Sequence, residues 1–265
     1  MIIIGEKING AVPSVKTAIE SRDEAFISKL AKDQTAAGAR YLDICAGTAP
    51  EKECGALKWL IDVVQAAVDT PLCIDSPDSG TIERVIAGVS QTGIVNSISA
   101  ESERSDAILS LLKGSQWQVI AQTMDKDGIP GGAGGRLAIA EAIIEKAARY
   151  GIPPDRIHID PLVAALSADN QSALTFVAAA NAIKTANPAV KLTAAISNIS
   201  FGMPLRKFLN MQFYSMAVVA GLDSAILDPC DNDMRFSVLA AEALMSRDML
   251  CRNFTNAYRK NRADR

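Results

Sequence analysis

The chain is poor in several residue types on which large classes of proteins depend. Aromatic residues make up only 5% of its 265 residues, there is one histidine, and the five cysteines form no Cys-x-x-Cys pair. An odd number of widely spaced cysteines supports neither a disulfide framework nor a zinc site, so we expect reduced thiols in a cytoplasmic protein. A formal charge of −3 offers no basic surface for nucleic acid or for an anionic membrane.

Long apolar runs and targeting signals are also missing from the sequence. No stretch approaches the roughly 18 apolar residues that a membrane-spanning helix needs. The first seven residues, Met-Ile-Ile-Ile-Gly-Glu-Lys, lack the basic leader and the long apolar segment of a secretory signal, and they are typical of a β-strand. We therefore expect a globular protein without membrane or nucleic-acid partners.

Short β-branched or apolar runs alternate with longer amphipathic segments along the whole chain. The predicted strands are residues 2–5, 40–45, 71–75, 93–98, 117–123, 156–160, 191–198 and 224–228. Apolar residues at steps of three and four predict helices over 24–37, 57–67, 79–89, 105–112, 137–150, 172–185, 207–220 and 235–245. Strand followed by helix eight times predicts an α/β fold, a TIM (β/α)8 barrel, and no linker divides residues 1–265, so we expect one domain.

An open, doubly wound sheet shares this alternation and is the structural competitor. Such a sheet usually carries a glycine-rich turn after its first strand, either Gly-x-Gly-x-x-Gly or a phosphate loop. The corresponding segment here, Glu-Lys-Ile-Asn-Gly at 6–10, has neither pattern. The missing turn favours the barrel.

Acids and amides recur where the predicted strands end. Helices cover the outer face of barrel strands, so that face must be apolar, and alternation then turns Asp43, Asp75, Asn96 and Asp160 inward. Polar residues at the carboxyl ends of barrel strands are typical of a site rather than of the scaffold. The members expected to join them at the mouth of the barrel are Glu6 after the first strand, Asn198 at the end of the seventh and Asp228 at the end of the eighth.

The residue types at this mouth indicate what it binds. Phosphate would require Lys, Arg or glycine-rich turns, and the amides and the single histidine fit a divalent metal poorly, so we expect no metal site. A carboxylate accepts two parallel hydrogen bonds from a ring N–H and an exocyclic NH₂, and an amide adds donors and an acceptor for a neighbouring carbonyl. The pattern indicates a pterin or another aminopyrimidine.

Five stretches of the sequence resemble the pterin-binding methyltransferase family, which includes methyltetrahydrofolate:corrinoid/iron–sulfur protein methyltransferase and the folate domain of cobalamin-dependent methionine synthase. They are MIIIGEKING at 1–10, IDS at 74–76, NS at 96–97, HIDPL at 158–162 and ISNISFGMP at 196–204. The resemblance implies a homodimeric TIM-barrel enzyme. It also implies transfer of a methyl group between N5 of tetrahydrofolate and the cobalt of a corrinoid, which at this chain length we expect on a separate corrinoid protein.

The resemblance assigns roles position by position. Asp75, Asn96 and Asp160 resemble the residues that anchor the pterin ring, and Asn198 resembles the amide that contacts N5 and acts in catalysis. The further residues in matching stretches, expected to bind substrate, are Glu6, Asn9, Asp43 and Arg206. Because cobalt is itself a strong nucleophile or leaving group, the protein needs no covalent nucleophile, and the sequence has no triad signature.

Two other functions remain open at this point. The sister family, dihydropteroate synthase, shares the barrel and the pterin pocket, although the Asn-x-Thr-Pro-Asp-Ser-Phe-like end of its first strand is absent here. A barrel that binds folate or docks a corrinoid protein without turnover is the second. The sequence also leaves the physiological direction of methyl transfer open.

Overall fold

The computed structural model describes residues 1–263 and contains a sheet of eight parallel strands. Neighbours in the sheet are neighbours in the chain, in the order β7-β6-β5-β4-β3-β2-β1-β8. The strands are β1 (Ile2–Asn9), β2 (Tyr41–Cys45), β3 (Leu72–Asp75), β4 (Ile94–Ile98), β5 (Gln118–Gln122), β6 (Ile157–Asp160), β7 (Lys191–Leu192) and β8 (Ser224–Leu227).

The two outermost strands of this order, β7 and β8, are joined by backbone hydrogen bonds. The Asp223 N–H donates to the Leu192 carbonyl at 3.0 Å, and the Ile226 N–H donates to the Ala194 carbonyl at 2.9 Å. Ala195 and Ile226 also form an isolated parallel bridge. A few hydrogen bonds therefore close the ring, and the predicted TIM barrel is confirmed.

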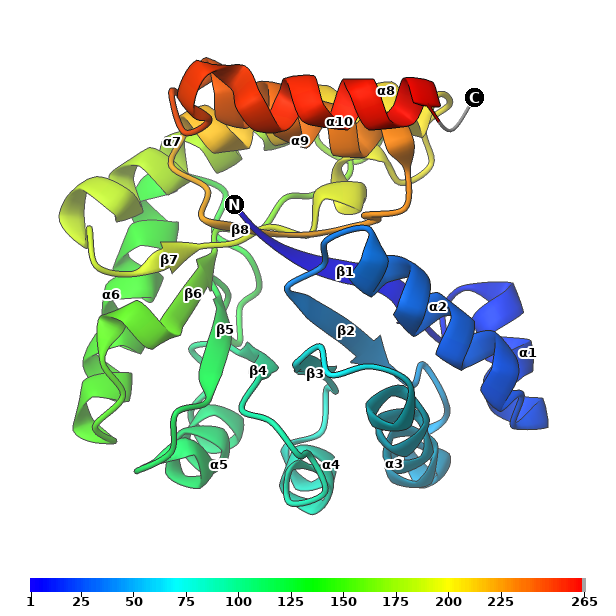
Figure 1. Cartoon of the computed structure of the whole chain (residues 1–265). Coiled ribbons are helices and arrows are strands. Elements are labelled where there is room, and N and C mark those ends of the chain that lie inside the picture. The colour runs from blue at the N-terminus through cyan, green and yellow to red at the C-terminus, as the bar shows by residue number, and fades with distance from the viewer. Residues whose placement is uncertain (264–265) are drawn as a thin grey trace.

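Helices surround the ring of strands, with α8, α9 and α10 side by side across the top of the view in Figure 1. They are α1 (Pro13–Ser21), α2 (Glu24–Ala36), α3 (Pro50–Ala67), α4 (Ser79–Ile86), α5 (Ser102–Leu112), α6 (Ala133–Arg149), α7 (Ser172–Ala186), α8 (Arg206–Val219), α9 (Asn232–Leu244) and α10 (Arg252–Ala263). Three 3₁₀ turns are η1 (Pro154–Arg156), η2 (Ile196–Ser200) and η3 (Met249–Cys251). None of the described helices is long and apolar enough to cross a membrane.

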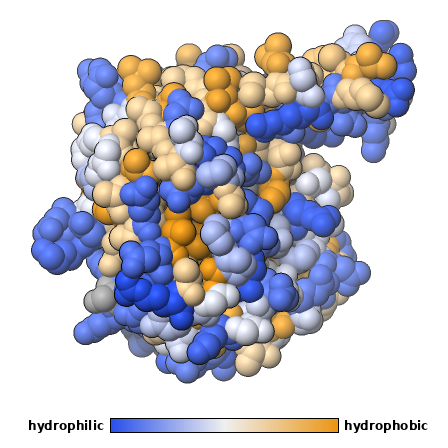
Figure 2. Space-filling model, turned by 90° about the vertical axis from the view of Figure 1, so that its left-hand side faces the viewer, coloured by the Kyte–Doolittle hydropathy of each residue, from blue (hydrophilic) through white to orange (hydrophobic). Residues whose placement is uncertain are grey.

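The two faces of the strands pack as the alternation predicts. Leu42 and Ile44 of β2 and Ile74 of β3 point outward and pack against the helices. The opposite face forms a separate inner cluster that includes Cys73 and Ile94. On the outer surface of the helices, Figure 2 shows mostly hydrophilic residues around a narrow hydrophobic strip. The inward direction of the polar strand residues therefore follows from the packing of their neighbours.

The single histidine belongs to a lower, inner layer of the barrel. One ring nitrogen of His158 lies 2.8 Å from the Ser224 hydroxyl, and the other lies 2.9 Å from the side-chain oxygen of Gln118. Burial lowers the pKa of His158 to about 3, with a smaller contribution from the nearby charge of Lys191. A neutral, doubly hydrogen-bonded imidazole of this kind is structural.

Two predicted strands have different bounds in the structure. β1 continues to Asn9 through a register shift between Gly5 and Ile8, so Glu6 lies within the strand and not after it. At this irregularity the Lys7 N–H donates to the Gln34 side chain at 3.0 Å. A Cβ at Gly5 would lie 2.4 Å from the same Gln34 oxygen, which explains the glycine.

The seventh strand is much shorter than predicted. It ends at Leu192, and the chain then forms the 3₁₀ turn η2, so Asn198 lies on a turn rather than at a strand end. Serine side chains in such segments compete with strand pairing by bonding to nearby backbone, and the Ser200 hydroxyl donates to the Ser197 carbonyl at 3.2 Å. Helix α1 was also not predicted from the sequence, because it is short and begins at Pro13.

Candidate active site

Three of the predicted site residues meet at the carboxyl ends of β2, β3 and β4. In the sheet, Cys45 is opposite Asp75, and Asp75 is opposite Asn96. The Asn96 amide donates to the Asp43 carboxylate at 3.1 Å across the barrel interior. Asp43 and Asn96 expose only 4% and 8% of their surface. These three strands therefore form one buried polar wall of the mouth.

Two carboxylates in this wall are close enough to influence each other. Burial raises the pKa of Asp43, and the charge of Asp75 raises it further. Burial also raises the pKa of Asp75, while the nearby Arg104 guanidinium opposes that rise. Two buried acids side by side cannot both ionise without cost, so the pair retains a proton at a higher pH than free carboxyls do. A ligand with N–H donors stabilises their charged form.

A third buried acid, Asp160, ends β6 and is 5% exposed. One of its carboxylate oxygens accepts a hydrogen bond of 2.8 Å from the Leu162 N–H, which fixes its orientation. Burial raises the pKa of Asp160 to about 7, against the opposing effects of this hydrogen bond and of the Arg136 charge. Arg136 itself donates to the carbonyls of Pro130, Pro161 and Leu162. The other oxygen of Asp160 thus remains available to a ligand.

These strand-end acids differ from the aspartates that cap helices. Asp23, Asp78 and Asp231 each accept hydrogen bonds from the first backbone N–H groups of the helices that follow them. Asp43 and Asp160 cap no helix, and burial makes their ionisation costly. Helix capping therefore explains the first group and not the second.

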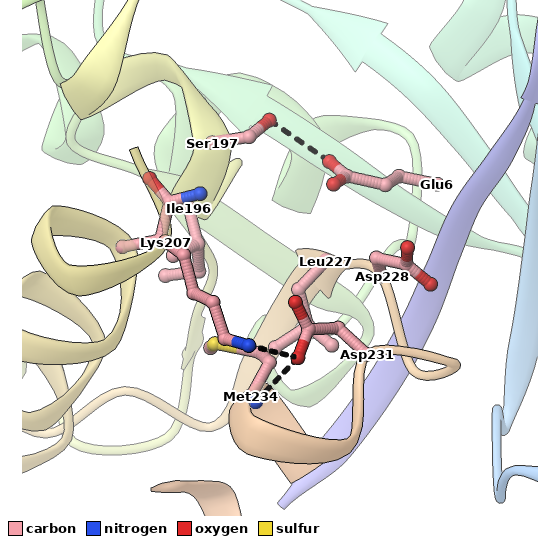
Figure 3. Close-up of a pocket in the computed structure, with 9 residues that line it drawn as sticks. Glu6, Ile196, Ser197, Lys207, Leu227, Asp228, Asp231 and Met234 are labelled. Atoms are coloured by element: carbon pink, nitrogen blue, oxygen red, sulfur yellow. Dashed lines mark hydrogen bonds and ion pairs between the residues drawn. The ribbon is translucent and has the colours of Figure 1, made fainter. Parts of the chain in front are cut away.

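The turn η2, which carries Asn198, is held from two sides. The Ser197 hydroxyl donates to the Glu6 carboxylate at 2.9 Å, and Figure 3 shows the two side chains pointing toward each other. Arg206 donates to the Ser197 carbonyl at 2.9 Å and to the Ser200 hydroxyl at 3.0 Å. Glu6 and Arg206 therefore fix the backbone on both sides of Asn198.

The side chain of Asn198 itself is half-buried and is left free by this arrangement. Within the described part of the chain, no protein group donates a hydrogen bond to its amide or accepts one from it, whereas the Asn198 backbone bonds to Ala195 and Phe201. An amide on a fixed turn, with its donor and acceptor atoms unbonded, can donate a hydrogen bond to a ligand or accept one from it.

A groove of about 440 Å³ adjoins the mouth beside β1. Glu6, Asn9 and Arg206 line it, together with apolar side chains of α1 and α2. The Asn9 side-chain oxygen accepts from the Ala11 N–H at 2.8 Å, which shapes the turn into α1. The guanidinium of Arg206 lies over the Phe201 ring at 4.8 Å. All eight predicted site residues thus lie at or beside one mouth.

The structure also extends the set of polar residues expected at the mouth. Asp228 lines the groove with Glu6 and Asn9, and it also pairs with Lys7 at 2.7 Å. Ser197, which anchors η2 through Glu6, was not singled out from the sequence, because its partner lies 191 residues away. In residues 1–263 no group of three or more His, Cys, Asp or Glu is arranged to hold a metal ion.

The mouth of this barrel combines buried acids with two amides, Asn96 and Asn198, and such groups can hydrogen-bond to a nitrogen-rich heterocycle. The chain belongs to the pterin binding enzyme family, whose sequence profile matches residues 13–228. Methylcorrinoid:tetrahydrofolate methyltransferase of Eubacterium limosum is 45% identical over 264 residues, which are 99% of this chain and 97% of that protein.

A more distant relative and a solved structure are also similar to this chain. Methionine synthase of Mycobacterium tuberculosis is 26% identical over 240 residues, which are 86% of this chain but 20% of that much longer protein. Among solved structures, dihydropteroate synthase of Xanthomonas albilineans with 4-aminobenzoic acid has a TM-score of 0.67 at 17% identity, over 94% of this chain and 93% of that one. An identity this low shows the fold alone.

Proposed function

We propose that this protein is a methyltransferase that moves a methyl group between the cobalt of a separate corrinoid protein and N5 of tetrahydrofolate, in the direction methylcorrinoid to tetrahydrofolate in the cell. The observation that carries the proposal is the 45% identity to the Eubacterium limosum methyltransferase along almost the whole of both chains. Membership of the pterin binding enzyme family supports it, and the buried acids and amides fit the N–H donors of a pterin ring.

In this proposal the polar wall and Asp160 hold the pterin. Asp75, Asn96 and Asp160 bond to the ring N–H and NH₂ groups, and Asp43 orients the Asn96 amide. The corrinoid arrives on its own protein and supplies the nucleophile or the leaving group for the methyl group. The task of this chain is to orient the ring and to exclude water around N5, which favours the in-line geometry of the transfer.

Asn198 acts on N5 in this proposal. A tertiary amine leaves poorly unless N5 gains a proton or a strong hydrogen bond as the methyl group departs, and an amide can donate that bond. In the other direction the Asn198 carbonyl accepts the N–H of N5 and directs its lone pair toward the methyl group. Glu6 and Arg206 keep the turn in place, and the groove beside Asn9 receives the rest of the folate.

The proposal also includes a single pterin-binding domain over residues 1–265, a homodimer and a cytoplasmic location. All five cysteines are unpaired in the structure, as expected in a reducing compartment. Exposed apolar side chains at the end of α9 and in η3, Leu244, Met249 and Leu250, supply a surface that a second copy would cover. Sedimentation of the purified protein measures the oligomeric state.

The proposed activity is tested with methylcobalamin and tetrahydrofolate, under anaerobic conditions and in the dark. We expect the absorption of methylcobalamin to fall and that of the demethylated corrinoid to rise, with formation of 5-methyltetrahydrofolate in equal amount. Binding of tetrahydrofolate without any change in the corrinoid spectrum would instead indicate the non-catalytic barrel. Condensation of 4-aminobenzoic acid with a pterin diphosphate would indicate a dihydropteroate synthase.

The anchoring of η2 gives a second prediction. Replacing Ser197 by alanine removes the hydrogen bond to Glu6 and leaves a half-buried carboxylate without this donor, so Asn198 is held less firmly. We expect the turnover number to fall about tenfold, while the affinity for tetrahydrofolate changes less than twofold. Ser215→Ala on α8 is the matched control, because that hydroxyl bonds only to the Met211 carbonyl of its own helix. Equal losses of affinity and turnover would contradict the positioning role.

A further inference from the structure

The start of α6 contains a buried arginine. Arg136 exposes only 4% of its surface, although burial of a guanidinium is costly and the positive end of the helix dipole disfavours a cation there. The backbone beside it is tightly packed, because a Cβ at Gly135 would lie 2.7 Å from the Pro130 Cβ. An arginine in so unfavourable a position requires specific partners.

The partners of Arg136 are three backbone carbonyls from two separate segments. Its Nε donates to the Pro130 carbonyl at 3.0 Å, and its Nη1 donates to the carbonyls of Pro161 at 2.9 Å and Leu162 at 2.6 Å. Pro130 belongs to the glycine-rich segment that leads into α6, and the other two residues directly follow Asp160 at the end of β6. One guanidinium therefore joins this segment to the backbone beside a buried acid of the mouth.

Leu162 connects Arg136 to Asp160 through its own backbone. Its φ of +64° lies in the left-handed region, which a leucine adopts only under strain. In this conformation the Leu162 carbonyl accepts from Arg136, while the Leu162 N–H donates to the Asp160 carboxylate at 2.8 Å. Pro161 has no N–H, so the Leu162 N–H is the first backbone donor after Asp160. The strained residue that orients the carboxylate is thus a residue that the guanidinium holds.

We infer that Arg136 is a positioning residue for the ligand. By holding the Leu162 backbone it keeps the Leu162 N–H on one oxygen of Asp160 and leaves the other oxygen to receive the pterin. The identity of that ligand rests on the proposed function, whereas the hydrogen bonds belong to this chain alone.

The competing explanation is that Arg136 stabilises the fold without any effect on Asp160. The Arg136→Lys substitution distinguishes the two explanations. It keeps the positive charge but lacks the planar set of donors that spans the three carbonyls.

The first measurement uses the protein alone and follows amide hydrogen exchange by NMR. We expect the Leu162 amide to exchange at least about tenfold faster in Arg136→Lys, and the Ile143 amide inside α6 to exchange as in the wild type. Arg149→Lys, at an exposed position on the same helix, is the control and should change neither rate. Arg136→Gln, measured in parallel, should give the same pattern as Arg136→Lys.

Three results of this measurement would overturn the inference. They are an unchanged Leu162 amide, equal acceleration of the Leu162 and Ile143 amides, and failure of both Arg136 variants to fold. The last two would show that the role of Arg136 is structural.

The second measurement is the dissociation constant of tetrahydrofolate at pH 7 in a double-mutant cycle. We expect about tenfold weaker binding for Arg136→Lys and about 100-fold for Asp160→Asn. The double variant should be no more than about 200-fold weaker, because Arg136 acts through Asp160. Turnover of Arg136→Lys at saturating folate should stay within about twofold of the wild type.

Independent losses in this cycle would instead multiply to about 1,000-fold in the double variant and would contradict the positioning role. A wild-type protein that binds no tetrahydrofolate would contradict the proposed function. The exchange of the Leu162 amide would still decide this inference.

Discussion

We expect the replacement of Asn198 by alanine to lower the rate of methyl transfer by about 100- to 1,000-fold and to leave the affinity for tetrahydrofolate within about threefold of the wild type. The reason is the difference between ground state and transition state. In the proposed complex the acids and Asn96 hold tetrahydrofolate, whereas N5 needs a hydrogen bond mainly while the methyl group is in transfer. A positioned donor of this kind raises the rate by about 10²–10⁴-fold. Single-turnover kinetics with methylcobalamin and a folate titration measure the two effects separately.

The turn that carries Asn198 allows the effects of this substitution on rate and on affinity to be compared without a change in the local backbone. The Asn198 side chain bonds to no described protein group, and η2 is held by Ser197, Glu6 and Arg206 through other atoms. The truncation should therefore leave the local backbone in place. Asn181→Ala, at an exposed position on α7, is the control and should have wild-type kinetics. Equal losses of rate and affinity would mean that Asn198 only holds the ring.

Replacing Asp160 by asparagine should mainly weaken the binding of tetrahydrofolate and change the rate little, which is the opposite of the effect expected for Asn198→Ala. The variant keeps an oxygen that accepts from the Leu162 N–H, so the local fold is preserved. It loses the charge and one of the two acceptors that a ring N–H and an NH₂ group require. We expect about 100-fold weaker binding of tetrahydrofolate at pH 7, and turnover at saturating folate within about fivefold of wild type. Unchanged affinity would rule out Asp160 as a pterin anchor.

The same substitution has a second effect, on stability. Burial raises the pKa of Asp160 from 3.8 to about 7, so between these values the folded protein holds a proton that the unfolded chain has released. The contribution of this group to the free energy of unfolding is therefore full below pH 4. It is lost progressively between about pH 4 and pH 7, at up to about 1.4 kcal/mol per unit, and the loss is complete above pH 7.

The Asp160→Asn variant has no carboxyl group to ionise at this position, so it does not lose this contribution to the free energy of unfolding as the pH rises. We expect the variant without ligand to match the wild type at about pH 3.5 and to be more stable at pH 8, by roughly 2–4 kcal/mol in urea unfolding. Asp62→Asn, at an exposed position on α3, is the control and should not change the pH dependence. A wild type that is as stable as Asp160→Asn at pH 8 would show that Asp160 ionises without cost and would contradict the burial argument.

Much of the barrel could be predicted from the sequence because the evidence for it is local. Six of the eight strands begin and end within one or two residues of their predicted bounds. The inward direction of Asp43 and Asp160 followed from alternation with apolar neighbours such as Leu42 and Ile159, which must face the helices. The two strands that differ are β1, which continues past a register shift with β2, and β7, which pairs with β6 over only two residues.

Local patterns fail where the register between strands changes. Strict alternation along β4 would put Ile98 on the same face as Asn96, but the pairing of β4 with β5 shifts between these two residues. Ile98 therefore joins the outer cluster, with Ile82 and Leu109 from the helices. A register shift depends on the partner strand, and no period within β4 reveals it.

By itself the sequence determined the eight-fold alternation, the apolar outer face of each strand and the set of polar residues left at the mouth, because side-chain direction along a strand is fixed by the chain's own geometry. Only the tertiary structure decided which of these groups meet. Asn96 bonds to Asp43, Ser197 to Glu6, and Lys7 to Asp228. These partners are between 53 and 221 residues apart, and closure of the ring, which no single segment encodes, brings them together.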